Sequence, residues 1–126
     1  MDNKIIIKKC NKCNSIVEVI VPCNCKDCGH VCCGEQMQTL QANNKEFSFE
    51  KHMPEYEIKD NKVYVKVNHV MEEPHFIEWI AIKNKKGKQV VFLQPNEVAE
   101  VVFDYQPESM IYSYCNLHGL WAVEVK

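Results

Sequence analysis

Short runs that alternate between apolar and polar residues mark the chain from residue 49 onward. Residues 62–67 alternate strictly between valine and a lysine or tyrosine, as a strand with one buried face should. Residues 76–82 and 88–93 are two further apolar runs, and the polar residues 84–87 between them predict a hairpin loop. The remaining apolar runs predict three more strands, at residues 97–105, 110–114 and 120–125.

These predicted strands are short, and no segment repeats apolar residues at helical spacing. About seven strands of this kind, bounded by turn-forming residues, are typical of a mainly β fold. We therefore expect residues 49–126 to form an immunoglobulin-like antiparallel β-sandwich.

The N-terminal part of the chain differs because it is short and rich in cysteine. Seven of the eight cysteines lie between Cys10 and Cys33, around two predicted strands at residues 4–8 and 16–21. A segment of this length cannot bury enough apolar surface to fold alone, so a bound metal must supply much of its stability. Residues 38–48 are polar and lack helical spacing. We expect three parts: a metal-binding domain at residues 1–37, a linker at 38–48 and the sandwich domain at 49–126.

Composition and charge restrict the functional classes. With 46% hydrophobic and 25% charged residues, the chain has the make-up of a globular protein. A formal net charge of −2 gives no basic surface for nucleic acid. No apolar run approaches the roughly 20 residues of a membrane span, and the first residues form no signal segment, so we expect a cytoplasmic protein. In a reducing cytosol, cysteines are better interpreted as metal ligands than as disulfides.

Four of the N-terminal cysteines have the spacing of a sulfur-only metal site. The knuckle Cys10-x-x-Cys13 is followed 19 residues after Cys13 by the adjacent pair Cys32 and Cys33. Four thiolates around one ion suit tetrahedral iron or zinc. Neighbouring side chains usually diverge, however, and the knuckle Cys25-x-x-Cys28 has ordinary zinc-ribbon spacing with the first. The spacing leaves both ligand sets open, and also leaves open a structural zinc site without chemistry.

The later part of the chain offers a different set of ligands, rich in imidazole. It contains four histidines near predicted loops and one cysteine: His52, His69, His75, His118 and Cys115. A structural zinc ion takes four ligands, whereas five suit a metal that accepts six and leaves one position for a small reactant. Imidazole together with thiolate favours iron, copper, nickel or zinc over magnesium or calcium. Loops at one end of a sandwich can bring such residues together.

The charge of such a site indicates what it would attract. Ferrous iron with four neutral imidazoles and one thiolate has a net charge of about +1, which draws small anions. Lys51, next to His52, would add to that attraction. In isolation, Glu50 and Lys51 would be interpreted as an ordinary solvated charge pair.

Together these motifs resemble those of a known family, the superoxide reductases. In the later part of the chain the resemblance rests on Glu50-Lys51-His52-x-Pro54, on His69-x5-His75 and on the run from Cys115 to Trp121. In the N-terminal part, Cys10-x-x-Cys13 with Cys32-Cys33-Gly34-x-x-Met37 resembles a desulforedoxin-type iron site. The whole chain is therefore similar to desulfoferrodoxin, the two-iron form of superoxide reductase.

The resemblance implies an enzyme whose substrate is superoxide. Ferrous iron held by the four histidines and Cys115 would give one electron to superoxide, and two protons would complete hydrogen peroxide without release of oxygen. Lys51 would steer and hydrogen-bond the anion, and Glu50 would occupy the vacant position in the resting ferric state. The thiolate of Cys115 would push electron density onto the iron.

The resemblance also implies how the rest of the protein is arranged. Residues 23–28 depart from the family pattern as an insertion with three further thiols. Despite this insertion, the resemblance favours one ligand set for the first ion, iron or else zinc: Cys10, Cys13, Cys32 and Cys33. It also implies a homodimer and a rubredoxin-like electron donor.

Two other classes of protein fit part of the pattern. The main alternative is a non-catalytic electron-transfer module of the cupredoxin or rubredoxin kind. Small copper proteins also place a cysteine and a histidine at the end of a β-sandwich, with a weak axial methionine. Here no methionine follows His118, and four histidines exceed the two that such a site needs. A structural double-zinc protein leaves the fifth ligand and the grouping Glu50-Lys51-His52 unexplained.

Overall fold

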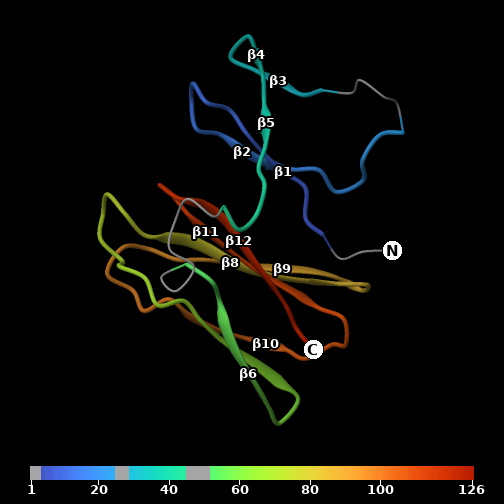
Figure 1. Ribbon diagram of the computed structural model, residues 1–126, viewed down its shortest axis with the longest axis vertical. Helices are drawn as coiled ribbons and strands as arrows, with labels where there is room; N and C mark the ends of the chain where they lie inside the picture. Colours follow the sequence, from blue (N-terminus) through green and yellow to red (C-terminus); the bar gives the residue numbers. More distant parts are fainter. Residues whose placement is uncertain (1–3, 25–28, 45–51) are drawn as a thin grey trace. The chain divides into compact units, whose positions relative to one another are not determined.

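The computed structural model describes residues 4–24, 29–44 and 52–126 (Figure 1). These residues form twelve strands and contain no helix that could cross a membrane. The chain divides into two compact units, one made by residues 4–41 and the other containing residues 42–126. The mainly β fold expected from the sequence is confirmed.

The smaller unit consists of two small antiparallel sheets. One sheet has the strand order β2-β1-β5, and the other pairs β3 with β4. The five strands are β1 (Ile7–Lys9), β2 (Ile16–Glu18), β3 (Val31–Cys32), β4 (Glu35–Gln36) and β5 (Gln38–Thr39). Among the described residues of this unit only Ile5, Ile7 and Cys10 are buried. So small a core contributes little to the free energy of unfolding.

The structure differs from the predicted boundaries of this part of the chain. The segment 38–48, expected to be a linker, begins with β5, in which Gln38 pairs with Lys9 and Thr39 with Lys8. Backbone hydrogen bonds hold this strand, and its polar side chains are exposed. A polar strand of this kind has no apolar alternation, which is why the sequence pattern does not reveal it.

The larger unit is an antiparallel β-sandwich of two sheets, which form separate layers in Figure 1. One sheet has the strand order β10-β7-β6 and the other the order β12-β11-β8-β9. Their strands are β6 (Glu55–Lys59), β7 (Lys62–Lys66), β8 (Ile77–Asn84), β9 (Gly87–Phe92), β10 (Glu100–Asp104), β11 (Met110–Cys115) and β12 (Gly119–Glu124).

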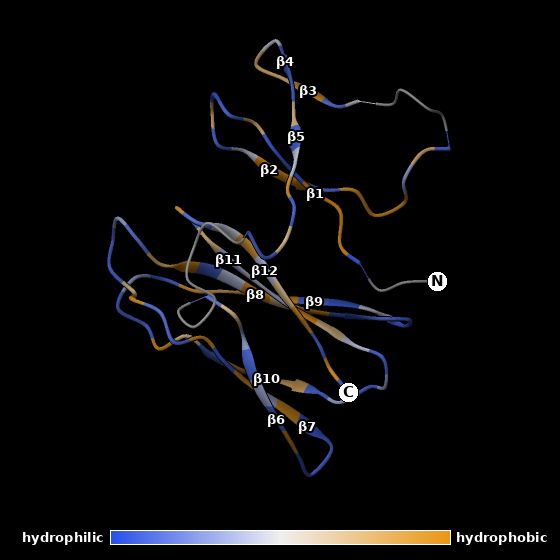
Figure 2. Cartoon of the chain, viewed as in Figure 1, coloured by the Kyte–Doolittle hydropathy of each residue, from blue (hydrophilic) through white to orange (hydrophobic). Residues whose placement is uncertain are grey.

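Alternation along these strands builds the core of the sandwich. In β7, Val63 and Val65 are buried, whereas Tyr64 between them is exposed. The hairpin that joins β8 to β9 has a hydrophilic tip, at Lys85 and Lys86 (Figure 2). The core also contains residues from three other strands: Ile77, Ile80, Ile82, Phe103 and Ile111.

An irregularity in the pairing of β8 with β11 decides which side chain enters the core beside Cys115. The register shifts between Tyr114 and Cys115, so that Cys115 pairs with Ile77 and Glu78 becomes the extra residue of a β-bulge. Ile77 is fully buried, and Glu78 is only partly buried. Without the bulge, strict alternation from Ile80 would turn the carboxylate of Glu78 into the core.

Phe103→Ala should destabilise the sandwich far more than Val102→Ala, although the two residues are neighbours in β10. Phe103 is 2% exposed and its loss leaves a cavity, whereas Val102 is 52% exposed. We expect costs of about 3–5 kcal/mol and about 0.5 kcal/mol or less, respectively. Denaturant unfolding of the metal-loaded protein measures both. Equal losses from the two variants would contradict the assignment of the core.

Candidate metal centre

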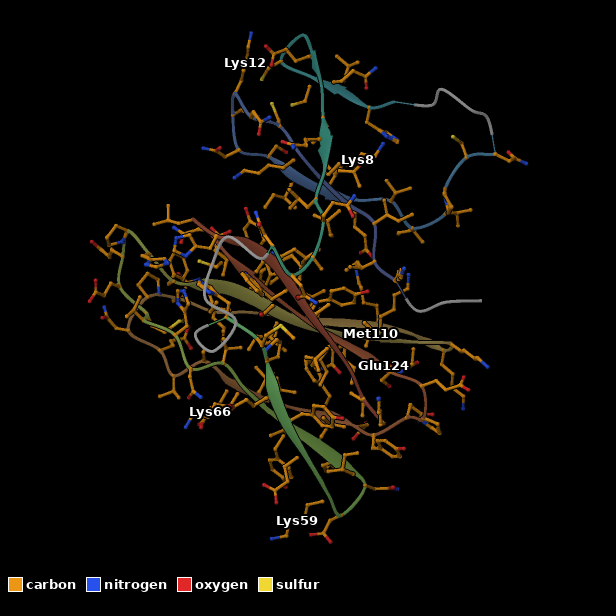
Figure 3. The ribbon with its side chains drawn as sticks, in the orientation of Figure 1. Lys8, Lys12, Lys59, Lys66, Met110 and Glu124 are labelled. Atoms are coloured by element: carbon orange, nitrogen blue, oxygen red, sulfur yellow. The ribbon has the colours of Figure 1, made fainter. Side chains whose placement is uncertain are left out.

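The residues Cys115 and His118 lie at the turn that joins β11 to β12. β11 ends at Cys115, β12 begins at Gly119, and these two residues pair. Gly119 has a φ of +87°, in the left-handed region that favours glycine. The backbone N–H of His118 donates to Cys115 Sγ at 3.3 Å. The pair Met110 and Glu124 lies at the opposite end of the same hairpin (Figure 3).

His69 and His75 lie in the connection between β7 and β8. Glu72 and His75 exchange two backbone hydrogen bonds of 3.0 Å, which close a tight turn. His69 Nδ1 donates to the carbonyl oxygen of Val70 at 2.6 Å. In the neutral ring, this bond leaves His69 Nε2 unprotonated and able to bind a cation.

His52 comes from the segment before β6 and is held by β11 and β12. Its ring stacks on Trp121, with ring centres 4.8 Å apart and planes 13° from parallel. Ser113 Oγ donates to the His52 carbonyl oxygen at 3.2 Å. Both partners are fully buried, so the core of the sandwich fixes the position of this histidine.

The five residues singled out from the later part of the sequence converge in the structure. One nitrogen from each of the four histidines and Cys115 Sγ all lie within 4.8 Å of one another. His52 Nε2 is 2.9 Å from His118 Nδ1, and His69 Nε2 is 3.4 Å from Cys115 Sγ. Within the described part of the chain, the buried His75 Nε2 has no hydrogen-bond partner.

These distances fit a single bound metal ion. With bonds of about 2.1 Å to nitrogen and 2.3 Å to sulfur, neighbouring ligand atoms lie about 3 Å apart, and opposite ones about 4.2 Å. The observed separations of 2.9 and 3.4 Å match neighbouring ligands, and the 4.8 Å limit accommodates opposite ones. A cation would also give the buried His75 Nε2 the partner that it lacks.

Burial sets the charges of the donors. It lowers the pKa of His69 to about 4, and it also lowers the pKa of His118. Burial raises the pKa of the Cys115 thiol, although the backbone N–H groups of Leu117 and His118 oppose this effect. At neutral pH the two imidazoles are therefore neutral, as metal ligands must be, and a bound cation would displace the thiol proton.

A second cluster in the smaller unit consists of sulfur alone. The Sγ atoms of Cys10, Cys13, Cys32 and Cys33 lie within 4.8 Å of one another. Cys13 Sγ is 3.6 Å from Cys32 Sγ, which is 4.0 Å from Cys33 Sγ. Four sulfurs around an ion at about 2.3 Å would be about 3.8 Å apart, so the spacing fits a tetrahedral site.

The turn between β3 and β4 explains how two adjacent cysteines join one cluster. Cys33 and Gly34, the central residues of this turn, have φ values of 53° and 77°. Two positive values in succession are those of a type I′ hairpin turn. The divergence of neighbouring side chains expected from the sequence therefore does not apply, because Cys33 adopts a left-handed backbone conformation.

Unequal hydrogen bonding makes one thiol of this cluster more acidic than another. The backbone N–H groups of Cys13 and Lys12 lower the pKa of Cys10 to about 7. Hydrogen bonds to the sulfurs of Cys13 and Cys10 raise the pKa of Cys32 to about 12. The Cys10 thiol thus loses its proton more readily than the Cys32 thiol and can begin metal binding as a thiolate.

Several other residues considered from the sequence lie elsewhere. Glu50 and Lys51 lie outside the described residues, as do both members of the alternative knuckle Cys25-x-x-Cys28. Cys23 is exposed and belongs to neither cluster of described residues. His30, near the cysteines in sequence, also lies outside both, and its Nδ1 is 2.8 Å from Lys8 Nζ.

The sequence did not single out the side chains that hold the histidines. Trp121 and Ser113 fix His52, and Asn116 bonds to the segment around His75. Trp121 and Asn116 stood within the run from Cys115 to Trp121, but only as parts of a motif. No spacing rule links Ser113 to His52, which is 61 residues away in the sequence.

Comparison with known proteins gives a consistent result over the whole chain. The sequence model of one protein family, Desulfoferrodoxin, matches residues 44–124. The desulfoferrodoxins of Syntrophotalea carbinolica and Nitratidesulfovibrio vulgaris are each 36% identical to this chain. Each alignment covers 98% of this chain and 99% of the relative.

Solved structures show the same fold. The superoxide reductase from Treponema pallidum has a TM-score of 0.74 and 25% identity, and the match covers 98% of this chain and 99% of that one. The one-iron superoxide reductase from Giardia intestinalis has a TM-score of 0.53 and 24% identity. That match covers 61% of this chain and 98% of the other, and it concerns the fold alone.

Cys32→Ser should loosen the smaller unit and leave the sandwich intact. Because residues 4–41 contain so few buried residues, we expect this unit to depend on a metal ion for stability. We expect amide hydrogen exchange in this unit to accelerate by about tenfold or more, with unchanged exchange in the sandwich. Cys23→Ser, at an exposed cysteine outside the cluster, serves as the control. Unchanged protection of residues 4–41 in Cys32→Ser would contradict the dependence on metal.

Proposed function

This chain belongs to the desulfoferrodoxin family, and we propose that it is a superoxide reductase that converts superoxide to hydrogen peroxide without releasing oxygen. The observation that carries the proposal is the convergence of four imidazoles and one thiol within 4.8 Å. The superoxide reductase from Treponema pallidum, similar along its whole length, supports the same activity.

We assign the metal of this centre as iron, held by His52, His69, His75, His118 and Cys115. Four imidazoles and one thiolate suit ferrous iron, and five donors leave room for a small reactant at a metal that accepts six. When bound, the ferrous ion would supply the single electron that reduces superoxide.

The protein contributes charge, tuning of the thiolate donor and orientation. Neutral imidazoles and a single thiolate leave a ferrous centre with a net charge of about +1, which attracts the superoxide anion. The His118 N–H bond to Cys115 Sγ withdraws electron density from the sulfur and thereby tunes its donation to the metal. The stacked Trp121 keeps the His52 ring in a fixed plane and excludes water from that side.

Lys51 and Glu50 complete the proposed active site. Their support is the family motif and their position next to His52 in the sequence. The ammonium group of Lys51 would steer superoxide to the site and hydrogen-bond it. The carboxylate of Glu50 would fill the vacant metal position in the resting ferric state.

The sulfur cluster is proposed to hold a second ion, iron or else zinc. Its four thiols and their tetrahedral spacing support this assignment. We divide the chain accordingly into a metal-binding domain, which extends with β5 beyond the expected boundary at residue 37, and the catalytic domain of residues 49–126. An iron ion there would be a one-electron site, and either metal would stabilise the smaller unit.

Resemblance to the family is also the basis for the proposed oligomeric state, location and electron donor. By resemblance, the protein is a homodimer in the cytoplasm and receives electrons from a rubredoxin-like donor. Size determination in solution tests the dimer, and reduction by a purified rubredoxin tests the donor. A monomer in solution would contradict the proposed dimer. A ferric protein that stays oxidised in the presence of reduced rubredoxin would contradict the proposed donor.

The proposed activity is tested by mixing the reduced protein anaerobically with superoxide. We expect ferric iron and one hydrogen peroxide for each superoxide consumed, with no oxygen, because the electron comes from the protein rather than from a second superoxide. Absorption spectroscopy, a peroxide assay and an oxygen electrode measure the products. Sustained oxygen release would identify a dismutase, and copper in the sandwich site would exclude the reductase.

Lys51→Ala should slow the capture of superoxide by about tenfold and weaken its dependence on ionic strength, because a steering charge acts on association. Lys59→Ala is the matched control. Lys59 is exposed at the tip of the β6–β7 hairpin, and its removal changes the net charge equally. Pulse radiolysis at several salt concentrations measures both rates. Equal rates and salt slopes for the two variants would make Lys51 an ordinary surface residue.

A further inference from the structure

Asn116, which follows Cys115, attaches the segment that carries His75. Its side-chain Oδ1 accepts a hydrogen bond from the backbone N–H of Phe76 at 3.0 Å. Its side-chain Nδ2 donates to the carbonyl oxygen of Pro74, also at 3.0 Å. Its own backbone N–H donates to the Phe76 carbonyl oxygen at 3.2 Å. One carboxamide thus bonds to the chain on both sides of His75.

The hydrogen bonds of Asn116 extend beyond the end of the sheet. The ladder between β8 and β11 ends at the pair Ile77 and Cys115, two residues short of His75. The two bonds between Glu72 and His75 fix the shape of their turn but do not link it to β11. The carboxamide of Asn116 therefore extends the link from the end of the ladder to the residues on either side of His75.

His75 needs such a link because its environment does not favour its position in the absence of a metal. Its Nε2 is buried and has no hydrogen-bond partner among the described residues, a state that costs free energy. The ring meets its neighbours edge to face, with centres 4.5 Å from His69 and 4.8 Å from His118. A constraint on the backbone is required to keep Nε2 directed at the cluster.

We propose that Asn116 is a positioning residue of the metal centre, which holds His75 in register with Cys115 and His118. The inference rests on the metal site of the proposed function. A carboxamide carries its acceptor and its donor on two separate atoms, so it satisfies the N–H of Phe76 and the carbonyl of Pro74 together. Such partners of ligand-bearing segments commonly contribute one to two orders of magnitude to metal affinity.

Three variants of the iron-loaded, full-length protein test the proposal. Asn116→Ala removes both side-chain bonds. Asn116→Asp has the same shape and keeps the acceptor, but it loses the donor and sets a carboxylate against the Pro74 carbonyl. Asn68→Ala is the control, because Asn68 is likewise adjacent to a ligand, His69, yet bonds to the exposed Glu55 side chain at 3.1 Å.

The measurement is competition for ferrous ion with a chelator under anaerobic conditions. The thiolate-to-iron absorption of the oxidised protein identifies the iron bound at the sandwich site. We expect both Asn116 variants to bind about 10- to 100-fold more weakly and to show a shifted absorption, with Asn68→Ala unchanged. Hydrogen exchange of a peptide spanning residues 72–79 should accelerate in both variants. A purely steric role would leave Asn116→Asp like the wild type.

The outcomes separate this inference from the proposed function. A loss of affinity below about fivefold in Asn116→Asp, or an equal loss in Asn68→Ala, overturns the positioning role. If Asn116→Ala does not fold, the isosteric Asn116→Asp alone decides. Failure of the wild-type protein to hold iron at the sandwich site would overturn the proposed function itself. Normal binding by the wild type and by both Asn116 variants would overturn only the role of Asn116.

Discussion

Five donor atoms lie within 4.8 Å of one another only because three separate segments end at the same edge of the sandwich. The hairpin of β11 and β12 supplies Cys115 and His118, the connection after β7 supplies His69 and His75, and the segment before β6 supplies His52. Each segment is attached to the rigid hairpin by contacts that involve no metal, including the Trp121 stack on His52. The site is therefore largely organised by the fold before any ion binds, which reduces the entropy lost on binding.

The two proposed metal centres differ in how they relate to the stability of their surroundings. The sandwich has a continuous core, from Val63 in β7 to Ile111 in β11, and its metal site adds to a fold that is already stable. The smaller unit has three buried residues among those described. Its sulfur cluster combines Cys10 and Cys13, which follow β1, with Cys32 and Cys33 of the β3–β4 hairpin. We therefore expect an ion at the sulfur cluster to contribute to holding the smaller unit together.

Local chemistry explains which features could be predicted from the sequence. Strands with apolar alternation, such as β7, can be predicted from spacing. The two groups of metal-binding residue types are visible in the sequence, but the choice among the N-terminal cysteines rested on the resemblance to a family. β5 is only two residues long and polar, so its backbone pairing leaves no periodic signal. The bulge at Glu78 and the bonds of Asn116 depend on contacts between segments about 40 residues apart, which a single sequence does not encode in any local pattern.

The central claim is that a single thiolate, Cys115, completes an imidazole-rich iron site at the end of the sandwich. The most direct test is the absorption spectrum of the oxidised, iron-loaded Cys115→Ser variant, compared with that of Cys23→Ser. We predict that Cys115→Ser abolishes the thiolate-to-iron absorption of the sandwich site and leaves the spectrum of the sulfur cluster unchanged, whereas Cys23→Ser retains both. Persistence of the sandwich-site absorption in Cys115→Ser would show that Cys115 is not a ligand and would contradict the account.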